Sequence, residues 1–509
     1  MKASNYLYDL IHSLEPAEKK YIKKYARLST KSKHNYQKLF EAINQQTSYD
    51  ENALLIKFRR APFVKHFAVA KNQLFELILK LLRQYHQNNS ASALINAAIE
   101  NGRLLYNRGL SSLAFKQLDK AYKLAKEYAE YLKMQEILDL KRHYKGQLKA
   151  HDLQEEMETL LQEKETLLKA ELEYLSYERI YQQVLVLIRK NLQFRNQQQQ
   201  QALEEVLPDG VLNPPKYKEH FHSQLRYLNS KNIYFFLKKN YIASIACSKK
   251  VIALWDQSPK LRQQEAERYI AALNNYMNCT YLDEDWAAIN HVIPKLKNIT
   301  AQSIRIQAII FESETIWKLN NYQALGRYDD LLKMIPEMET SLIRLKDSMH
   351  EIRHFMIIRS IGMIYFIFGD YHKALEYINQ TLALKHLALR EDLQLFVNMM
   401  LLFTHYHLDH IIFLDSALKN YRRKIKKKGL LYELEDFQFK LLQKLCAASD
   451  RTTKLNVLTT SQEELSRLVE QNPNLSTLLR SHLDLAIWIK SVQQNCTMKV
   501  LLEQKTDQE

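Results

Sequence analysis

A turn signal that recurs at nearly constant intervals constrains this 509-residue chain more than any other feature. Its clearest example lies in the segment 358–384, where two amphipathic stretches flank a tight turn at Gly369-Asp370-Tyr371. Comparable turns, spaced 39–45 residues apart, fall at Leu110, Asp152, Asn196, Asn240, Asp285, Arg327, Asp370 and Asp409. Such regular spacing predicts an array of helical pairs with a repeat of about 43 residues.

The composition excludes most folds that contain a sheet. Only 8 Gly and 9 Pro occur, where average usage would supply roughly 35 and 25. Hairpins favour Asn-Gly turns, and the chain has a single Asn-Gly pair, at Asn101-Gly102. Leu, Lys, Glu, Gln and Ala, which are good helix formers, are abundant instead. We therefore expect an all-α fold.

The residues around the turns carry a recognisable motif. Small residues, Gly362 and Ala374, occur where two helices must approach closely, and an Asp or Asn followed by an aromatic residue opens the second helix at Asn240, Asp285 and Asp370. This pattern resembles the tetratricopeptide repeat (TPR), although the repeats are longer than the usual 34 residues. The resemblance extends over residues 91–430. It implies an α-α superhelix, that is, a TPR-like solenoid.

The sequence predicts three parts: a basic helical N-terminal module (1–90), the repeat array (91–430) and a C-terminal helical cap (431–509) that closes the apolar end of the array. A polar stretch separates the module from the array, and Gln197–Gln201 and the Pro-rich segment 207–216 interrupt the array. Helices of the module are expected at Asn5–Leu14, Pro16–Leu28, Asn35–Gln46, Glu51–Arg59 and Phe67–Tyr85.

If the TPR resemblance holds, the first helix of each pair lines a concave groove that holds a protein or peptide. The groove-facing positions of the family map onto Asn229, Phe236, Asn274, Asn278, Tyr281, Asn320, Arg359, Phe366, Asn398 and His405. Asparagine can hydrogen-bond a peptide backbone in both directions. The alternative interpretation is an ordinary polar helix surface. We expect a non-enzymatic interaction protein or scaffold without a cofactor.

Positive charge is concentrated at the N-terminus and suggests an alternative function. Residues 1–90 hold 16 Lys and Arg against 7 Asp and Glu, a net charge of +9 out of +16 for the whole chain. Possible phosphate contacts are Lys19, Lys20, Lys23, Lys24 and Arg27, with tyrosines interleaved. The alternative function is therefore a nucleic-acid-associated regulatory protein. A solvated helix face would account for the same charges.

One string of residues raises a second alternative, a metal-dependent hydrolase. His405, His407, Asp409 and His410 reproduce the His-x-His-x-Asp-His string of metallo-β-lactamase-fold enzymes. That family places the string after a β-strand and needs further histidines downstream, where only His482 occurs. A helical turn accounts for the string equally well. We therefore predict no metal site and no catalytic residue.

Other sequence features favour a soluble cytoplasmic protein. The N-terminus lacks a signal-peptide pattern, and no uninterrupted apolar run is long enough to cross a membrane. The four cysteines are widely spaced, which is typical of small buried side chains rather than of disulfides. Gly-rich phosphate loops and Gly-x-Ser-x-Gly motifs are missing.

Overall fold

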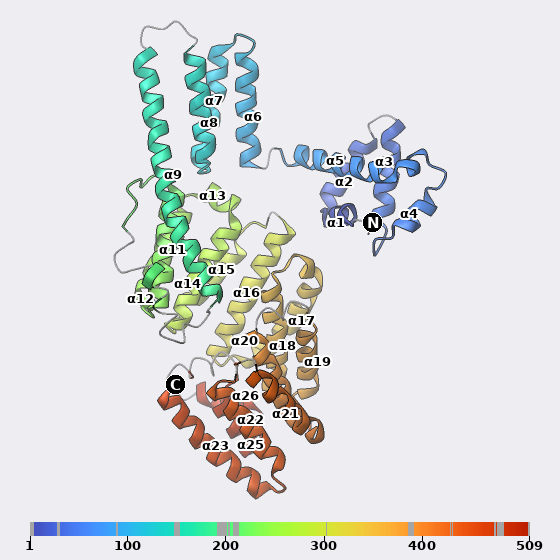
Figure 1. The fold of residues 1–509 in the computed structure, drawn as a ribbon, viewed down its shortest axis with the longest axis vertical. Coiled ribbons are helices and arrows are strands. Elements are labelled where there is room, and N and C mark those ends of the chain that lie inside the picture. The colour runs from blue at the N-terminus through green and yellow to red at the C-terminus, as the bar shows by residue number, and fades with distance from the viewer. Residues whose placement is uncertain are drawn as a thin grey trace. The chain divides into compact units, whose positions relative to one another are not determined.

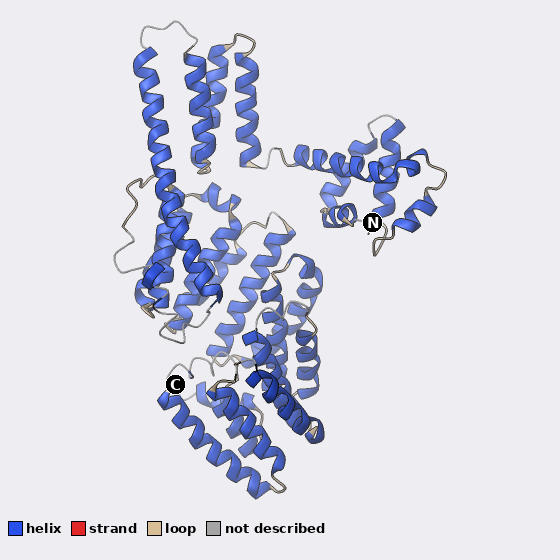
Figure 2. Cartoon of the chain, viewed as in Figure 1, coloured by secondary structure: helices blue, strands red, loops and turns tan. Residues whose placement is uncertain are grey.

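The computed structural model describes residues 5–506 apart from 28–30, 88–89, 147–152, 191–200, 202–203, 207–212, 302, 385–390, 428, 430, 473–474 and 476–482. Within these residues the regular elements are helices, and no strand occurs among them (Figure 2). The predicted all-α fold is confirmed. The predicted turns at Asp152 and Asn196, and all but the last residue of the glutamine run, lie outside the described residues.

The chain divides into two compact units. The first comprises residues 1–185 and 213–227, and the second comprises 186–212 and 228–509. Two helices, α9 (Leu153–Lys190) and α11 (Phe221–Leu237), contribute residues to both units. These divisions do not coincide with the predicted domain boundaries after residues 90 and 430, and those boundaries stay predictions.

In the first unit, the N-terminal helices enclose a hydrophobic core of their own. These elements are α1 (Tyr6–Ser13), α2 (Pro16–Arg27), α3 (Lys31–Asn44), α4 (Glu51–Lys57), η1 (Pro62–His66) and α5 (Phe67–Tyr85). Their core includes Leu7, Ile11, Leu39, Ile43, Leu74 and Ile78. The five predicted helices are confirmed, although α3 begins at Lys31 rather than Asn35. After them come α6 (Ala91–Tyr106), α7 (Ser111–Glu127), α8 (Tyr131–Lys145) and most of α9.

The second unit is a succession of helical pairs. After α11 come α12 (Tyr241–Asp256), α13 (Pro259–Gln264), α14 (Ala266–Leu282), α15 (Trp286–Lys297), α16 (Ile304–Ala324), α17 (Tyr328–Leu345), η2 (Lys346–Ser348), α18 (Glu351–Ile367), α19 (Tyr371–Leu382), α20 (Glu391–His407) and α21 (Ile411–Lys427). The C-terminal helices are α22 (Glu433–Ala447), α23 (Arg451–Gln471), α25 (Leu485–Gln494) and α26 (Met498–Thr506).

One turn geometry joins the two helices of a pair. A residue with positive φ is followed by a residue whose N–H donates to the carbonyl five residues earlier, at 2.8–3.1 Å. This Schellman arrangement uses carbonyls that the end of the first helix leaves free. The positive-φ residues are Gly109, Lys239, Glu284, Gly326, Gly369 and Asp409. The side chains of Asn240, Asp285 and Asp370 then cap the second helix, as predicted.

The last of these turns corrects the predicted register by one residue. Asp409 was expected at the capping position, but it occupies the left-handed position with φ 57°. His410 follows it and donates its N–H to the His405 carbonyl at 3.1 Å. Ile411 then takes the position of the aromatic residue. Aspartate tolerates left-handed backbone better than most residues, so the turn forms without glycine.

Packing within the second unit follows the order of the pairs. The first helices contact one another, α14 with α16 and α16 with α18, while α15 and α17 each pack against the first helices on both sides (Figure 1). A Cβ atom on Gly362 would lie 3.3 Å from the Tyr377 Cβ and 3.6 Å from the Ala374 carbonyl oxygen, which explains the small residue there. One core runs from Ala308 to Leu501. This is helical-repeat packing.

The C-terminal helices fold back onto the turns of earlier pairs. Trp488 of α25 packs edge-on against Phe403, with ring centroids 4.7 Å apart, and donates from Nε1 to His407 Nε2 at 2.8 Å. Lys499 of α26 pairs with Asp329 of α17 at 2.7 Å. The C-terminal helices therefore cover turns of the pairs formed by α16 to α21, whereas closure of the end of the array stays a prediction.

Substitution of Gly369 tests this contact directly. Gly369 has φ +83°, and an added Cβ would lie 2.9 Å from Thr497 Cγ2, just before α26. We expect Gly369→Ala to lower the free energy of unfolding by about 2–3 kcal/mol, through backbone strain and displacement of Thr497. Gly429→Ala is the matched control, because Gly429 has φ +70° with no atom within 4 Å. It should cost about 1 kcal/mol. Faster amide exchange in α26 for Gly369→Ala alone would support the contact, and equal costs would contradict it.

Candidate functional site

The ten groove positions implied by the TPR resemblance all lie on first helices of pairs, namely α11, α14, α16, α18 and α20. Asn278 is exposed. Seven are half-buried: Asn229, Phe236, Tyr281, Asn320, Arg359, Asn398 and His405. Asn274 and Phe366 are buried. Contact of these residues with a partner stays a prediction.

The two buried positions have internal roles. Asn274 donates from Nδ2 to Ser313 Oγ at 2.9 Å and accepts from Trp317 Nε1 at 2.7 Å, so it links α14 to α16. Phe366 has no exposed surface and packs edge-on against Tyr371, with ring centroids 5.3 Å apart. Neither side chain offers surface to a partner. The recurrent asparagines therefore do not all face outward.

A second internal asparagine was not anticipated from the sequence. Asn232 of α11 is buried, donates to Ser248 Oγ at 2.7 Å and accepts from the Ser244 hydroxyl, both on α12. Its spacing of three residues from Asn229 puts both on neighbouring positions of one helix. Periodicity therefore could not distinguish the residue that links two helices from the one nearer the surface.

Arg359 of α18 is the least compensated charge among the predicted positions. Its Nε is shut off from solvent and makes no hydrogen bond, and no described carboxylate pairs with its guanidinium. The guanidinium lies over the Phe396 ring of α20, 5.0 Å from the centroid. Burial alone lowers the pKa of Arg359 to about 10. The surrounding cavity, about 10 Å³, is lined by Met363, Ile378, Thr381, Phe396, Val397 and Met400.

Another arginine of the same helix is compensated. The Nε of Arg353 lies 3.8 Å from a carboxylate oxygen of Glu312, on α16. Glu312 is buried and also accepts the N–H of His350 at 2.6 Å. Burial raises the pKa of Glu312, which the His350 hydrogen bond and Arg353 partly offset. Within α18, the fold therefore supplies a carboxylate for one arginine and none, among the described residues, for the other.

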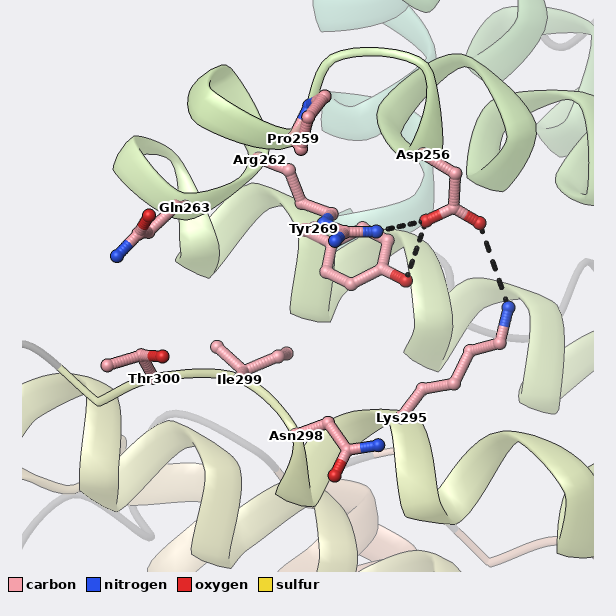
Figure 3. Close-up of a pocket in the computed structure, with 9 residues that line it drawn as sticks. All are labelled: Asp256, Pro259, Arg262, Gln263, Tyr269, Lys295, Asn298, Ile299 and Thr300. Atoms are coloured by element: carbon pink, nitrogen blue, oxygen red, sulfur yellow. Dashed lines mark hydrogen bonds and ion pairs between the residues drawn. The ribbon is translucent and has the colours of Figure 1, made fainter.

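A larger cavity of about 480 Å³ lies at the carboxyl ends of α12 and α15, beside α13 and α14 (Figure 3). Three of its side chains contact Asp256. The Asp256 carboxylate accepts hydrogen bonds from Arg262 and, at 3.3 Å, from the Tyr269 hydroxyl, and it lies 3.7 Å from Lys295 Nζ. The remaining lining residues are Pro259, Gln263, Asn298, Ile299 and Thr300. No motif in the sequence indicates this cavity, because helix ends that meet only in the folded chain leave no local pattern.

The polar side chains of this cavity interact mainly with one another. Arg262, Lys295 and the Tyr269 hydroxyl all interact with the Asp256 carboxylate. Burial raises the pKa of Tyr269, and the negative charge of Asp256 adds to this effect. The described lining contains no Ser, Cys or His that a neighbouring base could activate. What it offers is a set of polar groups that a small polar molecule could contact.

The His-x-His-x-Asp-His string is divided between the protein core and a turn. His407 turns toward Trp488, as described above, whereas His405 and His410 bring their Nδ1 atoms to 2.9 Å from each other. Asp409 is exposed in the turn. Across the part of the chain that the structure describes, no three His, Cys, Asp or Glu side chains gather closely enough to hold a metal ion. Of the histidines in the string, the structure brings His405 and His410 together, while His407 contacts Trp488.

The predicted phosphate contacts all lie on α2 of the first unit. Lys20 and Lys24 are exposed and Lys19 and Lys23 are half-buried. Arg27 ends the helix, and its side chain lies outside the described residues.

Of the helices described, none combines the length and the apolar character needed to cross a membrane. Comparison with protein-family models, curated proteins and solved structures found no match to this chain.

Proposed function

We propose that the protein is a non-enzymatic helical-repeat protein, similar to TPR proteins, that binds a protein or peptide partner. The partner would lie on the first helices of the pairs, from α11 to α20. In this proposal the protein acts as a scaffold in the cytoplasm. All four cysteines are free thiols, which suits a reducing compartment.

The uncompensated guanidinium of Arg359 is the observation that carries the proposal. A buried charge is costly unless it is paired, and guanidinium pairs best with a carboxylate through two parallel hydrogen bonds. No described side chain supplies that carboxylate, so a partner is the natural source. Met363, Phe396 and Met400 surround the charge. The cavity of about 10 Å³ is too small for a carboxylate, so an acidic side chain or a C-terminal carboxylate of the partner would contact the accessible part of the half-buried Arg359 side chain.

The TPR assignment rests on local geometry as well. The Schellman turn, the capping side chain and the aromatic residue recur together at Asn240, Asp285 and Asp370. Gly362 and Ala374 permit the close approach of α18 and α19. The capping residue, the aromatic residue that follows it and the two small residues are the features that carry the resemblance to TPR.

Substitution of Arg359 tests the function. We expect Arg359→Met to weaken binding of the captured partner by at least tenfold, because a charge-assisted hydrogen bond contributes about 1.5–3 kcal/mol. The partner would be captured on full-length protein after nuclease treatment, identified by mass spectrometry and titrated by calorimetry. Arg344→Met, on an exposed arginine in the last turn of α17, is the matched control and should leave affinity unchanged.

Stability separates a lost contact from a damaged fold. Because Arg359 is half-buried and pairs with no described carboxylate, Arg359→Met should preserve or raise the free energy of unfolding. Equal affinity of Arg359→Met and Arg344→Met for the captured partner would contradict the role of Arg359. Failure to retain any polypeptide in the absence of nucleic acid would contradict the proposed function itself.

A further inference from the structure

The lysines of α2 are segregated on one side of the helix. Lys19, Lys20, Lys23 and Lys24 occupy positions i, i+1, i+4 and i+5, which span less than half of the helix circumference. Ile22 faces the core and is only 3% exposed. The helix therefore presents a continuous basic face.

No described carboxylate neutralises this face. None of the four lysines makes an ion pair with a described residue. Glu18, the acidic residue of the same helix, instead pairs with His86 at 2.6 Å and accepts the Glu15 N–H at 2.8 Å. Burial, and then the charge of Lys23, lower the pKa of Lys19. Like charges thus lie close together without compensation by a described carboxylate.

A row of tyrosine rings borders the basic face. Tyr21 lies between Tyr25 and Tyr85, with ring centroids 4.6 and 5.0 Å away. Tyr85 belongs to α5, so the row is anchored in the N-terminal core. Tyr25 is the exposed end of the row, with 42% of its surface accessible. Exposure of this extent leaves part of the Tyr25 ring accessible to solvent.

We infer that α2 is a docking surface for single-stranded nucleic acid, with phosphates on the lysines and a base stacked on Tyr25. Lysines attract the phosphate backbone irrespective of sequence, and exposed aromatic rings stack on unpaired bases. A duplex hides its base faces, so the tyrosine favours a single strand. An anionic membrane is less suited, because Ile22 points inward and leaves the basic face without an aliphatic side chain to insert. This function goes beyond partner binding by the second unit.

The test measures binding of a labelled oligothymidylate to full-length protein by fluorescence anisotropy at several salt concentrations. We expect Lys20→Gln/Lys23→Gln/Lys24→Gln to weaken binding at least tenfold and to reduce the slope of log K against log salt by about 2, at about 0.7 per phosphate contact. The matched control is Lys116→Gln/Lys120→Gln/Lys123→Gln, three exposed lysines of α7 that remove the same charge. It should leave both quantities unchanged.

Tyr25 provides a second, uncharged readout. Tyr25→Leu should weaken single-strand binding about fivefold or more, whereas Tyr25→Phe keeps the ring and should bind as the parent does. Equal losses in the α2 and α7 triple variants would overturn the inference, as would unchanged binding in the α2 variant. Tighter binding to vesicles of phosphatidylcholine and phosphatidylserine than to the oligonucleotide, or no binding to the oligonucleotide at low salt, would also overturn it.

Discussion

Replacing Trp488 by alanine is expected to lower the free energy of unfolding of the second unit by about 3–5 kcal/mol, the usual cost of truncating a fully buried aromatic side chain. Trp488 has no exposed surface. Its ring meets Phe403 and Tyr406, with centroids 4.7 and 5.7 Å away, and its Nε1 donates to His407. Truncation therefore leaves a cavity and removes the donor to a largely buried acceptor.

Comparison of Trp488→Ala with Trp488→Phe separates the contribution of apolar packing from that of the hydrogen bond. Trp488→Phe keeps most of the apolar contact and loses the hydrogen bond, so its cost should be about 1–3 kcal/mol. Chemical denaturation gives the free energies, and amide hydrogen exchange in α25 and α26 reports whether these helices detach. A cost below about 1 kcal/mol for Trp488→Ala would mean that the C-terminal helices do not stabilise the array.

Acidification is expected to destabilise the second unit through His407. Burial lowers the pKa of His407 from 6.5 to about 4. The ring stacks on Tyr371, with centroids 4.0 Å apart, and its Nε2 accepts from Trp488, which requires the unprotonated nitrogen. The unfolded chain binds a proton at the ordinary pKa, so protonation favours unfolding. The stabilisation is complete above pH 6.5 and is lost progressively as the pH falls through about 4.

The size of this loss is about 3 kcal/mol, at 1.36 kcal/mol for each unit of pKa difference. His407→Asn keeps an acceptor for Trp488 but does not titrate, so its stability should depend less steeply on pH across this range. Comparison of His407→Asn with the parent protein isolates the contribution of His407 to the pH dependence of stability. Other groups with shifted pKa values are present in both proteins: burial raises the pKa of Glu312 and lowers those of His354 and His405. The exposed His372 is the control site: His372→Asn should follow the parent profile. Parallel profiles for His407→Asn and the parent would contradict the buried neutral state.

Local sequence signals predicted much of the fold. The pairing of helices followed from the spacing of turns, because Asp and Asn caps and left-handed residues act over a few positions. Five of the predicted turn residues in the described chain, from Leu110 to Asp370, directly follow a positive-φ residue. The last turn failed by one position, because Asp409 suits both a capping and a left-handed site.

The site depended on contacts that no local pattern encodes. Trp488 and His407 are 81 positions apart, and nothing in the string around His407 indicates a tryptophan donor. Asn274 was expected to face a partner, yet Ser313 and Trp317 take up its amide. The isolation of Arg359 from carboxylates is equally a property of packing. Helical periodicity names the residues that share a face, but not the neighbour which that face meets.

Hydrogen exchange of the complex with its captured partner tests the central claim most directly, because it reports which helices the partner covers. We expect slower exchange in the first helices, above all in α18, which carries Arg359, and in α20, which carries Phe396, with little change in residues 6–85. Protection confined to residues 6–85, or none in α11 to α20, would contradict it.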